Sequence, residues 1–175
     1  KKELLYESAS YHSVVFVGYD NSGVPKYANL RGTRSGFKGE APGSDKRFAF
    51  QLVPESPDGI VHVFESAIDL LSYATMVQLE GGSWQEESLL SLGGISKDLT
   101  TGKLPLALDY YLKENKVENI LLHLDNDTAG RNATKNLRQM LKGSYAVQEC
   151  PPHHGKDVND QLKHMLGLNR EAEDY

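Results

Sequence analysis

The spacing of hydrophobic and polar positions changes near residue 60. Before it, short apolar runs at 14–19 and 47–52, and a returning segment at 27–31, are separated by turn residues such as those at 20–23. Runs of this length between turn signals predict strands, and 14–19 and 27–31 are expected to form a hairpin. The glycine-containing segment 32–46 has no such run and is expected to be a loop. The pattern therefore predicts a small β-rich module.

After residue 60, short β-branched or leucine-rich runs alternate with longer stretches whose apolar residues recur at helical spacing. The expected strands are 60–64, 89–92, 117–124 and 145–149, and the expected helices are 67–77, 104–115, 128–142 and 158–166. Strands that alternate with helices are typical of a mostly parallel sheet with right-handed crossovers. We therefore expect an α/β fold with helices flanking the sheet.

These patterns predict three parts of the chain. They are a β-rich module at 1–58, an α/β domain at 59–168 and a polar, frayed tail at 169–175, with Pro54, Pro57 and Gly59 in the linker. The 175 residues suit one domain with a small appendage. Because the chain begins with Lys1 and not with methionine, we expect it to be a fragment of a longer protein.

Composition narrows the class of protein. The mean hydropathy is −0.49 and no apolar run approaches the ~18 residues of a membrane span, so no membrane partner is expected. No secretory signal is visible at the N-terminus, and Cys150 is the single cysteine, which excludes an internal disulfide. A cytoplasmic protein is the expectation.

For nucleic-acid binding, the distribution of charged residues along the chain is more informative than the net charge. A net charge of −5 argues against a basic nucleic-acid coat protein but not against a nucleic-acid enzyme with an acidic metal site. Six basic residues nevertheless gather between positions 26 and 47: Lys26, Arg31, Arg34, Lys38, Lys46 and Arg47. We expect five of them, Arg31, Arg34, Lys38, Lys46 and Arg47, to form a basic channel.

Two carboxylates follow the apolar run 117–124. Asp125 and Asp127 are one residue apart, and strand geometry would turn both side chains the same way. Two carboxylates this close repel each other unless a cation lies between them, and Mg²⁺ prefers hard oxygen ligands. Ligands of open α/β sheets also bind beyond the carboxyl ends of the strands. A magnesium site is therefore predicted here.

Polar residues also follow two other predicted elements. Glu65 ends the run 60–64 and is followed by Asp69, while Lys156, Asp157 and Asp160 open the last helix. Asp69 and Asp157 can equally be residues that stabilise a helix N-terminus through the helix dipole or as an N-cap. Because parallel strands end at one edge of the sheet, these segments are expected to converge with the aspartate pair.

Four motifs, in their order along the chain, resemble those of the Toprim domain, the catalytic module shared by bacterial primases, topoisomerases and some nucleases. They are Glu65 with Asp69, Leu92-Gly93-Gly94, Asp125-x-Asp127-x-x-Gly130 and Lys156-Asp157-x-Asn159-Asp160, and they span residues 60–166. The resemblance implies a Rossmann-like Toprim sheet. The segment 16–47 resembles the β-rich module that precedes Toprim in primase-like proteins of plasmids and conjugative elements. Ser66 departs from the family, which usually has glycine there.

The resemblance also implies roles for residues. It makes Glu65 a general acid/base or a metal ligand, and it makes Asp125 and Asp127 catalytic ligands of one or two Mg²⁺ ions, or of Mn²⁺ in their place. Asp157 would be a further metal ligand. The residues expected to bind substrate or nucleic acid are Asp69, Arg131, Lys156, Asp160, Arg31, Arg34, Lys46 and Arg47.

The implied function is Mg²⁺-dependent nucleotidyl or phosphoryl transfer by a primase-like DNA replication protein of a mobile element. Its partners would be single-stranded DNA, nucleoside triphosphates and other replication or mobilisation domains of the same longer protein. Two alternatives remain open: a Toprim nuclease, which uses the same carboxylates to activate water, and a nucleic-acid-binding module without turnover. Ser66 keeps the second alternative open.

Overall fold

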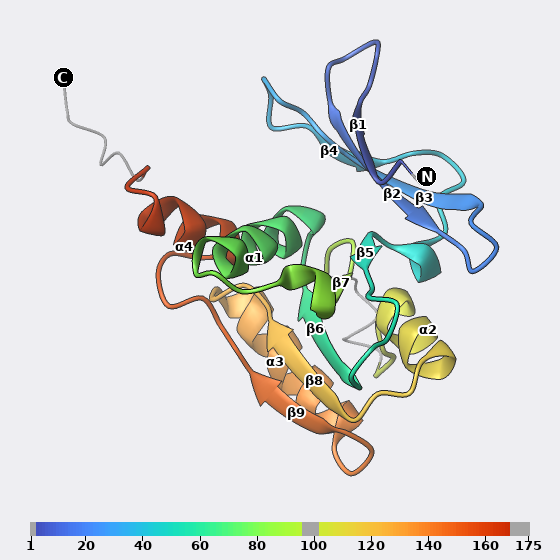
Figure 1. The fold of residues 1–175 in the computed structure, drawn as a ribbon, viewed down its shortest axis with the longest axis vertical. Helices are drawn as coiled ribbons and strands as arrows, with labels where there is room; N and C mark the ends of the chain where they lie inside the picture. Colours follow the sequence, from blue (N-terminus) through green and yellow to red (C-terminus); the bar gives the residue numbers. More distant parts are fainter. Residues whose placement is uncertain (1–2, 96–101, 169–175) are drawn as a thin grey trace.

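Two β-sheets organise the chain in the computed structural model, which describes residues 3–95 and 102–168 (Figure 1). The predicted tail at 169–175 lies outside the described residues. The N-terminal sheet is antiparallel with the order β1-β2-β3-β4, where β1 is Leu5–Glu7, β2 is Val14–Tyr19, β3 is Pro25–Arg31 and β4 is Lys38–Glu40. The turn between β2 and β3 is held by Asp20, whose Oδ1 accepts hydrogen bonds from the backbone N–H groups of Ser22 and Val24 at 2.9 Å each. The predicted hairpin is thus confirmed.

Two local predictions for this region are wrong, and one strand was missed. The expected loop 32–46 contains β4, and β1 was not predicted. The expected strand 47–52 begins instead as the 3₁₀ helix η1 (Lys46–Phe48), capped by Asp45, and only Gln51–Leu52 forms a strand, β5. The reason is tertiary, because Phe48 and Ala49 are buried in the core beneath α2 (Leu106–Glu114).

The second sheet has five strands in the order β5-β7-β6-β8-β9. The strands beyond β5 are β6 (Ile60–Phe64), β7 (Ser88–Ser91), β8 (Asn119–His123) and β9 (Ala146–Glu149). All pairings are parallel except that of β5 with β7. This confirms the expected mostly parallel α/β sheet. It also places β5 in the second sheet, although the sequence prediction put it in the N-terminal module.

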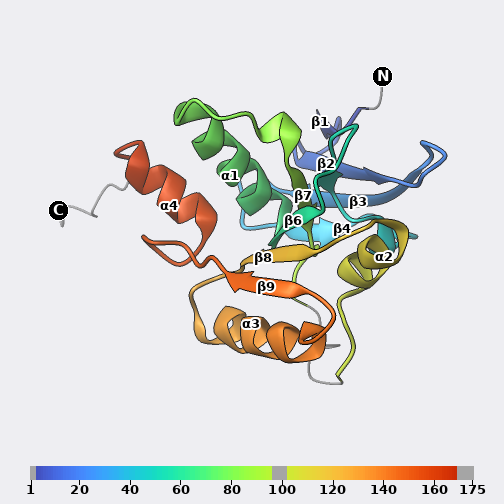
Figure 2. The same ribbon diagram turned by 60° about the horizontal axis from the view of Figure 1, so that its bottom comes forward.

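Helices cover both faces of this sheet. Figure 2 shows α1 (Ala67–Leu79) and α4 (Val158–Met165) on one face and α3 (Thr128–Leu141) on the other. Leu108 of α2 and Leu137 of α3 pack with Val63 on the second face, whereas Leu70 of α1 and Val158 of α4 share a separate core on the first. A further 3₁₀ helix, η2 (Trp84–Glu86), precedes β7. None of the helices described in residues 3–95 and 102–168 combines the length and apolar character needed to cross a bilayer.

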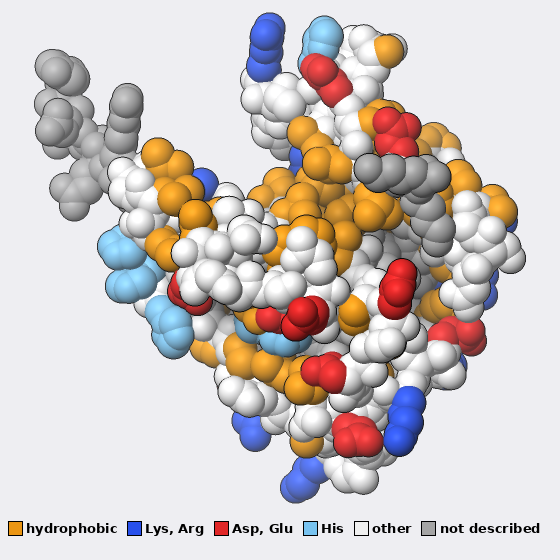
Figure 3. Space-filling model, viewed as in Figure 1, with side chains coloured by type: hydrophobic (Ala, Val, Ile, Leu, Met, Phe, Trp, Pro, Cys, Tyr) orange, Lys and Arg blue, Asp and Glu red, His pale blue; other side chains and the backbone are white. Residues whose placement is uncertain are grey.

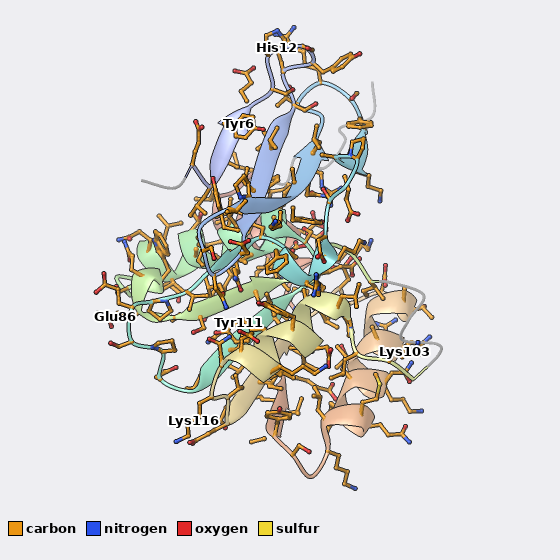
Figure 4. All side chains as sticks on the ribbon, turned by 90° about the vertical axis from the view of Figure 1, so that its right-hand side faces the viewer. Tyr6, His12, Glu86, Lys103, Tyr111 and Lys116 are labelled. Carbon is orange, nitrogen blue, oxygen red and sulfur yellow. The ribbon has the colours of Figure 1, made fainter. Side chains whose placement is uncertain are left out.

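The two sheets are joined by side chains as well as by the chain itself. Glu40 accepts a hydrogen bond from the Tyr27 hydroxyl at 2.9 Å and pairs with Lys46 at 3.0 Å. Lys46 also donates to the Gly93 carbonyl at 3.3 Å, which ties the N-terminal sheet to the loop after β7. Figure 3 shows apolar side chains gathered in the hollow between the N-terminal sheet and α1, and Figure 4 shows Tyr111 within the body and His12 at the far tip of the N-terminal sheet. The modules are therefore packed against each other.

A pair of half-buried histidines links the two neighbouring strands β6 and β8. His62 Nδ1 and His123 Nε2 are 3.0 Å apart, and both rings pack against Tyr73 of α1. Burial, with a smaller effect from His62, lowers the pKa of His123 to about 3, and burial also lowers the pKa of His62. A neutral pair shares one hydrogen bond, whereas a doubly protonated pair has two donors and no acceptor.

This pair predicts a stability that falls in acid. A histidine whose folded pKa is depressed destabilises the fold as pH drops below its ordinary value of 6.5, because the unfolded chain binds the proton first. We expect His123→Phe to remove about 2 kcal/mol of the loss between pH 6.5 and 4.5, measured by urea unfolding. Burial raises the pKa of Glu65, so this residue changes stability with pH in the opposite direction, and the informative quantity is the difference between variant and wild type. An equal slope in both proteins would contradict the prediction.

Candidate active site

The acidic residues converge because their strands are neighbours. β6 and β8 are parallel and paired, with Phe64 opposite His123. Glu65 lies one residue beyond this pair and Asp125 two residues beyond it, at the same edge of the sheet. Asp125 and Asp127 both follow the end of β8, which stops at His123, one residue before the end of the predicted strand 117–124. The connection to α3, not strand alternation, brings the two carboxylates together.

Glu65 has the strongest electrostatic signature at this edge. Its pKa is raised to about 7, first by burial and then by the negative charges of Asp125, Asp69 and Asp127, while Lys156 acts in the opposite direction. A carboxyl group that titrates near neutrality can both accept and donate a proton at physiological pH. The same property marks Glu65 as a functional candidate on physical grounds.

Asp125 and Asp127 already hold one cation between them. Lys156 Nζ lies 3.3 Å from Asp125 Oδ2 and 3.1 Å from Asp127 Oδ2. Burial raises the pKa of Asp125 despite this contact, whereas the Gly130 backbone N–H and Lys156 lower the pKa of Asp127. The two carboxylates in turn raise the pKa of Lys156. Their oxygens are therefore placed to converge on a positive charge.

The donor set fits Mg²⁺ in one specific way. Among residues 3–95 and 102–168, no three His, Cys, Asp or Glu side chains form a group that could hold a metal ion. The predicted set of Glu65, Asp125, Asp127 and Asp157 is thus not a protein-only cage. Mg²⁺, however, is commonly bound by one or two carboxylates together with substrate phosphates and water. Asp125 and Asp127 supply such a pair.

Gly130 allows the close approach that positions this pair. Asp127 is the N-cap of α3 and accepts a hydrogen bond from Gly130 N–H at 2.9 Å. A Cβ at Gly130 would lie 2.0 Å from the Asp125 carbonyl oxygen, closer than real Cβ atoms come to any neighbour. A side chain at this position would therefore push the Asp125 backbone away from α3.

We accordingly expect Gly130→Ala to destabilise the protein by about 2–4 kcal/mol, because backbone must move to admit the methyl group. Urea unfolding of the variant measures the loss. Gly36→Ala is the matched control, since a Cβ at Gly36 would meet nothing within 4 Å and the backbone there needs no positive φ. Equal stabilities of the two variants would contradict the argument.

Ser66 and Asp69 act within the protein at the start of α1. Ser66 is the N-cap with an extended backbone at φ −130°, and it donates from Oγ to Asp69 Oδ2 at 2.6 Å. Asp69 is only 6% exposed, and its other oxygen accepts from the Asn159 N–H of α4 at 3.4 Å. The serine that replaces the family's glycine therefore serves as a helix cap. Asp69 joins the two helices behind the site, where burial raises its pKa.

The segment that opens α4 is also tied to the aspartate loop. Asn126 N–H donates to the Lys156 carbonyl at 2.6 Å. Asp157 is the N-cap of α4 and accepts a hydrogen bond from the Asp160 N–H at 2.8 Å. Its carboxylate therefore caps the helix, the alternative that the sequence left open. Asp160 accepts from Lys156 N–H at 3.3 Å and pairs with Lys163 at 3.1 Å. Both aspartates hold the loop that presents Lys156.

A cavity of about 460 Å³ lies between the N-terminal sheet and this edge. Arg31 and Lys38 line it together with Glu65 and Gly93. The Nε of Arg31 is buried and, among the residues that the structure describes, has no hydrogen-bond partner. A buried donor without a partner leaves a place for an acceptor from a ligand. The cavity thus faces cations of one module toward a carboxylate of the other.

The remaining predicted basic residues are placed differently. Lys46 is held by Glu40 and Gly93 beside the cavity. Arg47 pairs with Asp45 at 2.6 Å and lies over the Tyr110 ring of α2, and neither it nor Arg34 lines the cavity. Arg131 donates to the Asn126 carbonyl at 2.8 Å. The expected channel of five residues is therefore reduced to Arg31 and Lys38, with Lys46 at its rim.

Sequence reasoning missed part of the cavity wall. Tyr27, Asn29 and Glu40 line it from β3 and β4. Burial and the neighbouring Glu40 raise the pKa of Tyr27, so its hydroxyl stays a hydrogen-bond donor. The alternation of side chains along β3 puts Tyr27, Asn29 and Arg31 on one face. This two-residue alternation could have identified these residues, but only once β3 was known to face the second sheet.

Comparisons with known proteins agree with this geometry. A 65 kDa protein of Zymomonas mobilis is 29% identical over 172 residues, which cover 90% of this chain and 28% of that protein. The primase fragment of the bacteriophage T7 primase-helicase is similar in structure, with a TM-score of 0.62, 19% identity and coverage of 94% of this chain and 63% of that one. A DnaG primase catalytic domain bound to single-stranded DNA has a TM-score of 0.61, 14% identity and coverage of 94% and 53%.

The chain therefore spans little more than a quarter of the length of the Zymomonas protein that it matches. A family described as a protein of unknown function matches residues 1–56. The Toprim-like family matches residues 62–162, more than half of the chain, and includes Glu65 and the aspartate pair. With its primase-type fold and these carboxylates at one sheet edge, this chain belongs to the Toprim-like family.

Proposed function

We propose that this chain is the catalytic part of a primase-like replication protein, and that it transfers nucleotides onto a primer copied from single-stranded DNA. The observation that carries the proposal is the shared cavity, in which Arg31 and Lys38 face Glu65. Its volume of about 460 Å³ is within the range of small-molecule sites. The resemblance of the N-terminal module to that of plasmid and conjugative proteins supports a mobile-element context.

Each group has a role that follows from its position. Arg31 and Lys38 would bind the phosphates of a nucleoside triphosphate, with Arg31 Nε donating to a phosphate oxygen. Asp125 and Asp127 would hold a divalent ion, Mg²⁺ or Mn²⁺, which polarises a phosphate oxygen and stabilises the leaving oxygen when bound. Lys156 lies between the two aspartates and would neutralise phosphate charge. Glu65, with its pKa near 7, would accept the proton of the attacking hydroxyl.

The test is a primer-synthesis assay with single-stranded template and nucleoside triphosphates, run beside a nuclease assay on an end-labelled strand. We expect short primers with Mg²⁺ or Mn²⁺ and none with a chelator. Shortening of the labelled strand without synthesis would favour the nuclease. Metal-independent binding of the template with neither reaction would favour the module without turnover.

A further inference from the structure

A basic stripe runs along α3, outside the cavity. It consists of Arg131, Lys135, Arg138 and Lys142, all exposed, and the segment 128–142 contains no Asp or Glu. Spacings of four, three and four residues place the four side chains within an arc of about 60° on the helix. The stripe therefore occupies one side of α3, on the face of the sheet opposite α1 (Figure 2).

A solvated helix face usually mixes charges of both signs, and α2 and α4 of this protein do so. In α2, Lys113 pairs with Asp109 at 2.6 Å, and in α4, Lys163 pairs with Asp160 at 3.1 Å. α3 has no acidic partner of its own, and among the described residues its one ion pair is that of Arg138 with Glu149 of β9. In a chain of net charge −5, this separation of charge distinguishes the stripe from an ordinary exposed face.

One end of the stripe lies beside Asp125. A hollow of about 320 Å³ is lined by Asp125, Arg131 and Lys135, and a second of about 560 Å³ is lined by Lys135, Arg138 and Lys142. Lys135 and Glu149 line both hollows, so the two hollows are neighbours along the helix. The stripe is about 16 Å long, so a nucleic acid that lies along it presents several phosphates to its cations.

We propose that this stripe binds the phosphate backbone of a nucleic acid strand that passes the catalytic edge and continues along α3. Cations at regular spacing recognise a backbone without reading its bases. The surface is distinct from the cavity of Arg31 and Lys38, on which the proposed function rests. The inference requires only that the protein binds nucleic acid.

The test is the binding of fluorescently labelled single-stranded and duplex DNA, measured by anisotropy at several salt concentrations. The test variant is Lys135→Gln with Lys142→Gln, two exposed lysines that no ion pair holds among the described residues. The control variant is Lys113→Gln with Lys116→Gln, which removes the same charge from α2 and the loop after it. We expect only the test variant to bind DNA about tenfold more weakly. The slope of its log binding constant against log salt concentration should become shallower by about 1.4–1.8.

The form that shows the larger loss identifies the strand, single or duplex, that follows α3. Binding and salt slopes equal to those of the control in both forms would overturn the proposal, as would wild-type protein that binds neither form. Loss of binding to anionic lipid vesicles, with DNA binding unchanged, would assign the stripe to a membrane and also overturn it. Primer synthesis is measured separately, so stripe-dependent binding without synthesis would contradict only the proposed function.

Discussion

Asp125→Asn is expected to abolish primer synthesis, with a loss of at least ~10³-fold. The substitution keeps the size of the side chain but removes one of the two carboxylates that converge on a cation, and phosphoryl transfer depends on charge neutralisation more than on covalent chemistry. The Asp125 side chain is only 11% exposed, so little water can take over its charge. Primer synthesis is measured with the full chain in Mg²⁺ and in Mn²⁺.

Two further measurements make this result specific. Calorimetric titration with Mn²⁺ should show weaker binding in the variant, whereas thermal unfolding should show that the fold persists, because Lys156 keeps its contact with Asp127. Asp109→Asn is the matched control, since Asp109 belongs to a surface ion pair of α2. Turnover within tenfold of wild type would remove Asp125 from the mechanism.

Glu65→Gln is expected to inactivate the protein and at the same time to stabilise it. Folding raises the pKa of this carboxyl group from 4.5 to about 7, so the folded state loses stability as pH rises through that interval. Glutamine carries no charge at any of these pH values. Because Glu65 is partly exposed, we expect a gain of about 1–2 kcal/mol above pH 7 rather than the full value of the shift, and no gain below pH 4.5.

The activity of this variant should fall by about 10²–10⁴, the usual contribution of a positioned acid or base. Urea unfolding at pH 5 and pH 8 measures the stability difference, and Glu80→Gln, at an exposed position after α1, is the control. A variant that is less stable than wild type at pH 8 would show that the ionised Glu65 carboxylate does not destabilise the fold. The combination of lower activity and higher stability is typical of a residue retained for function.

Periodicity alone located the framework of the site. The predicted strands and helices after residue 60 agree with β6 to β9 and α1 to α4 to within about two residues at most ends, because apolar spacing reports directly which faces are buried. The motifs also placed Glu65 and the aspartate pair correctly after β6 and β8. The sequence predicted that parallel strands end at one edge, whereas the structure showed that β6 and β8 are adjacent, which brings Glu65 close to the aspartate pair.

Contacts between distant segments decided the rest. Phe48 and Ala49 turned an expected strand into η1, since the core under α2 outweighed local β preference. The sequence predicted that Lys156 binds phosphate but not that it lies between Asp125 and Asp127. Its position depends on how the loop before α4 packs on the β8–α3 connection.

The α/β class and the positions of the acidic residues could be predicted without coordinates, since apolar periodicity, helix caps and carboxylate positions are local properties of the chain. The Toprim topology was implied by the resemblance to that family. Which cations face the acidic edge of the sheet depends on packing between distant segments. Arg31 and Lys38 reach the cavity while Arg47 turns to α2, and the basic residues of α3 form a separate stripe. The physical reason is that the position of a charged residue in the sequence does not determine the surface on which its side chain lies, which tertiary packing decides.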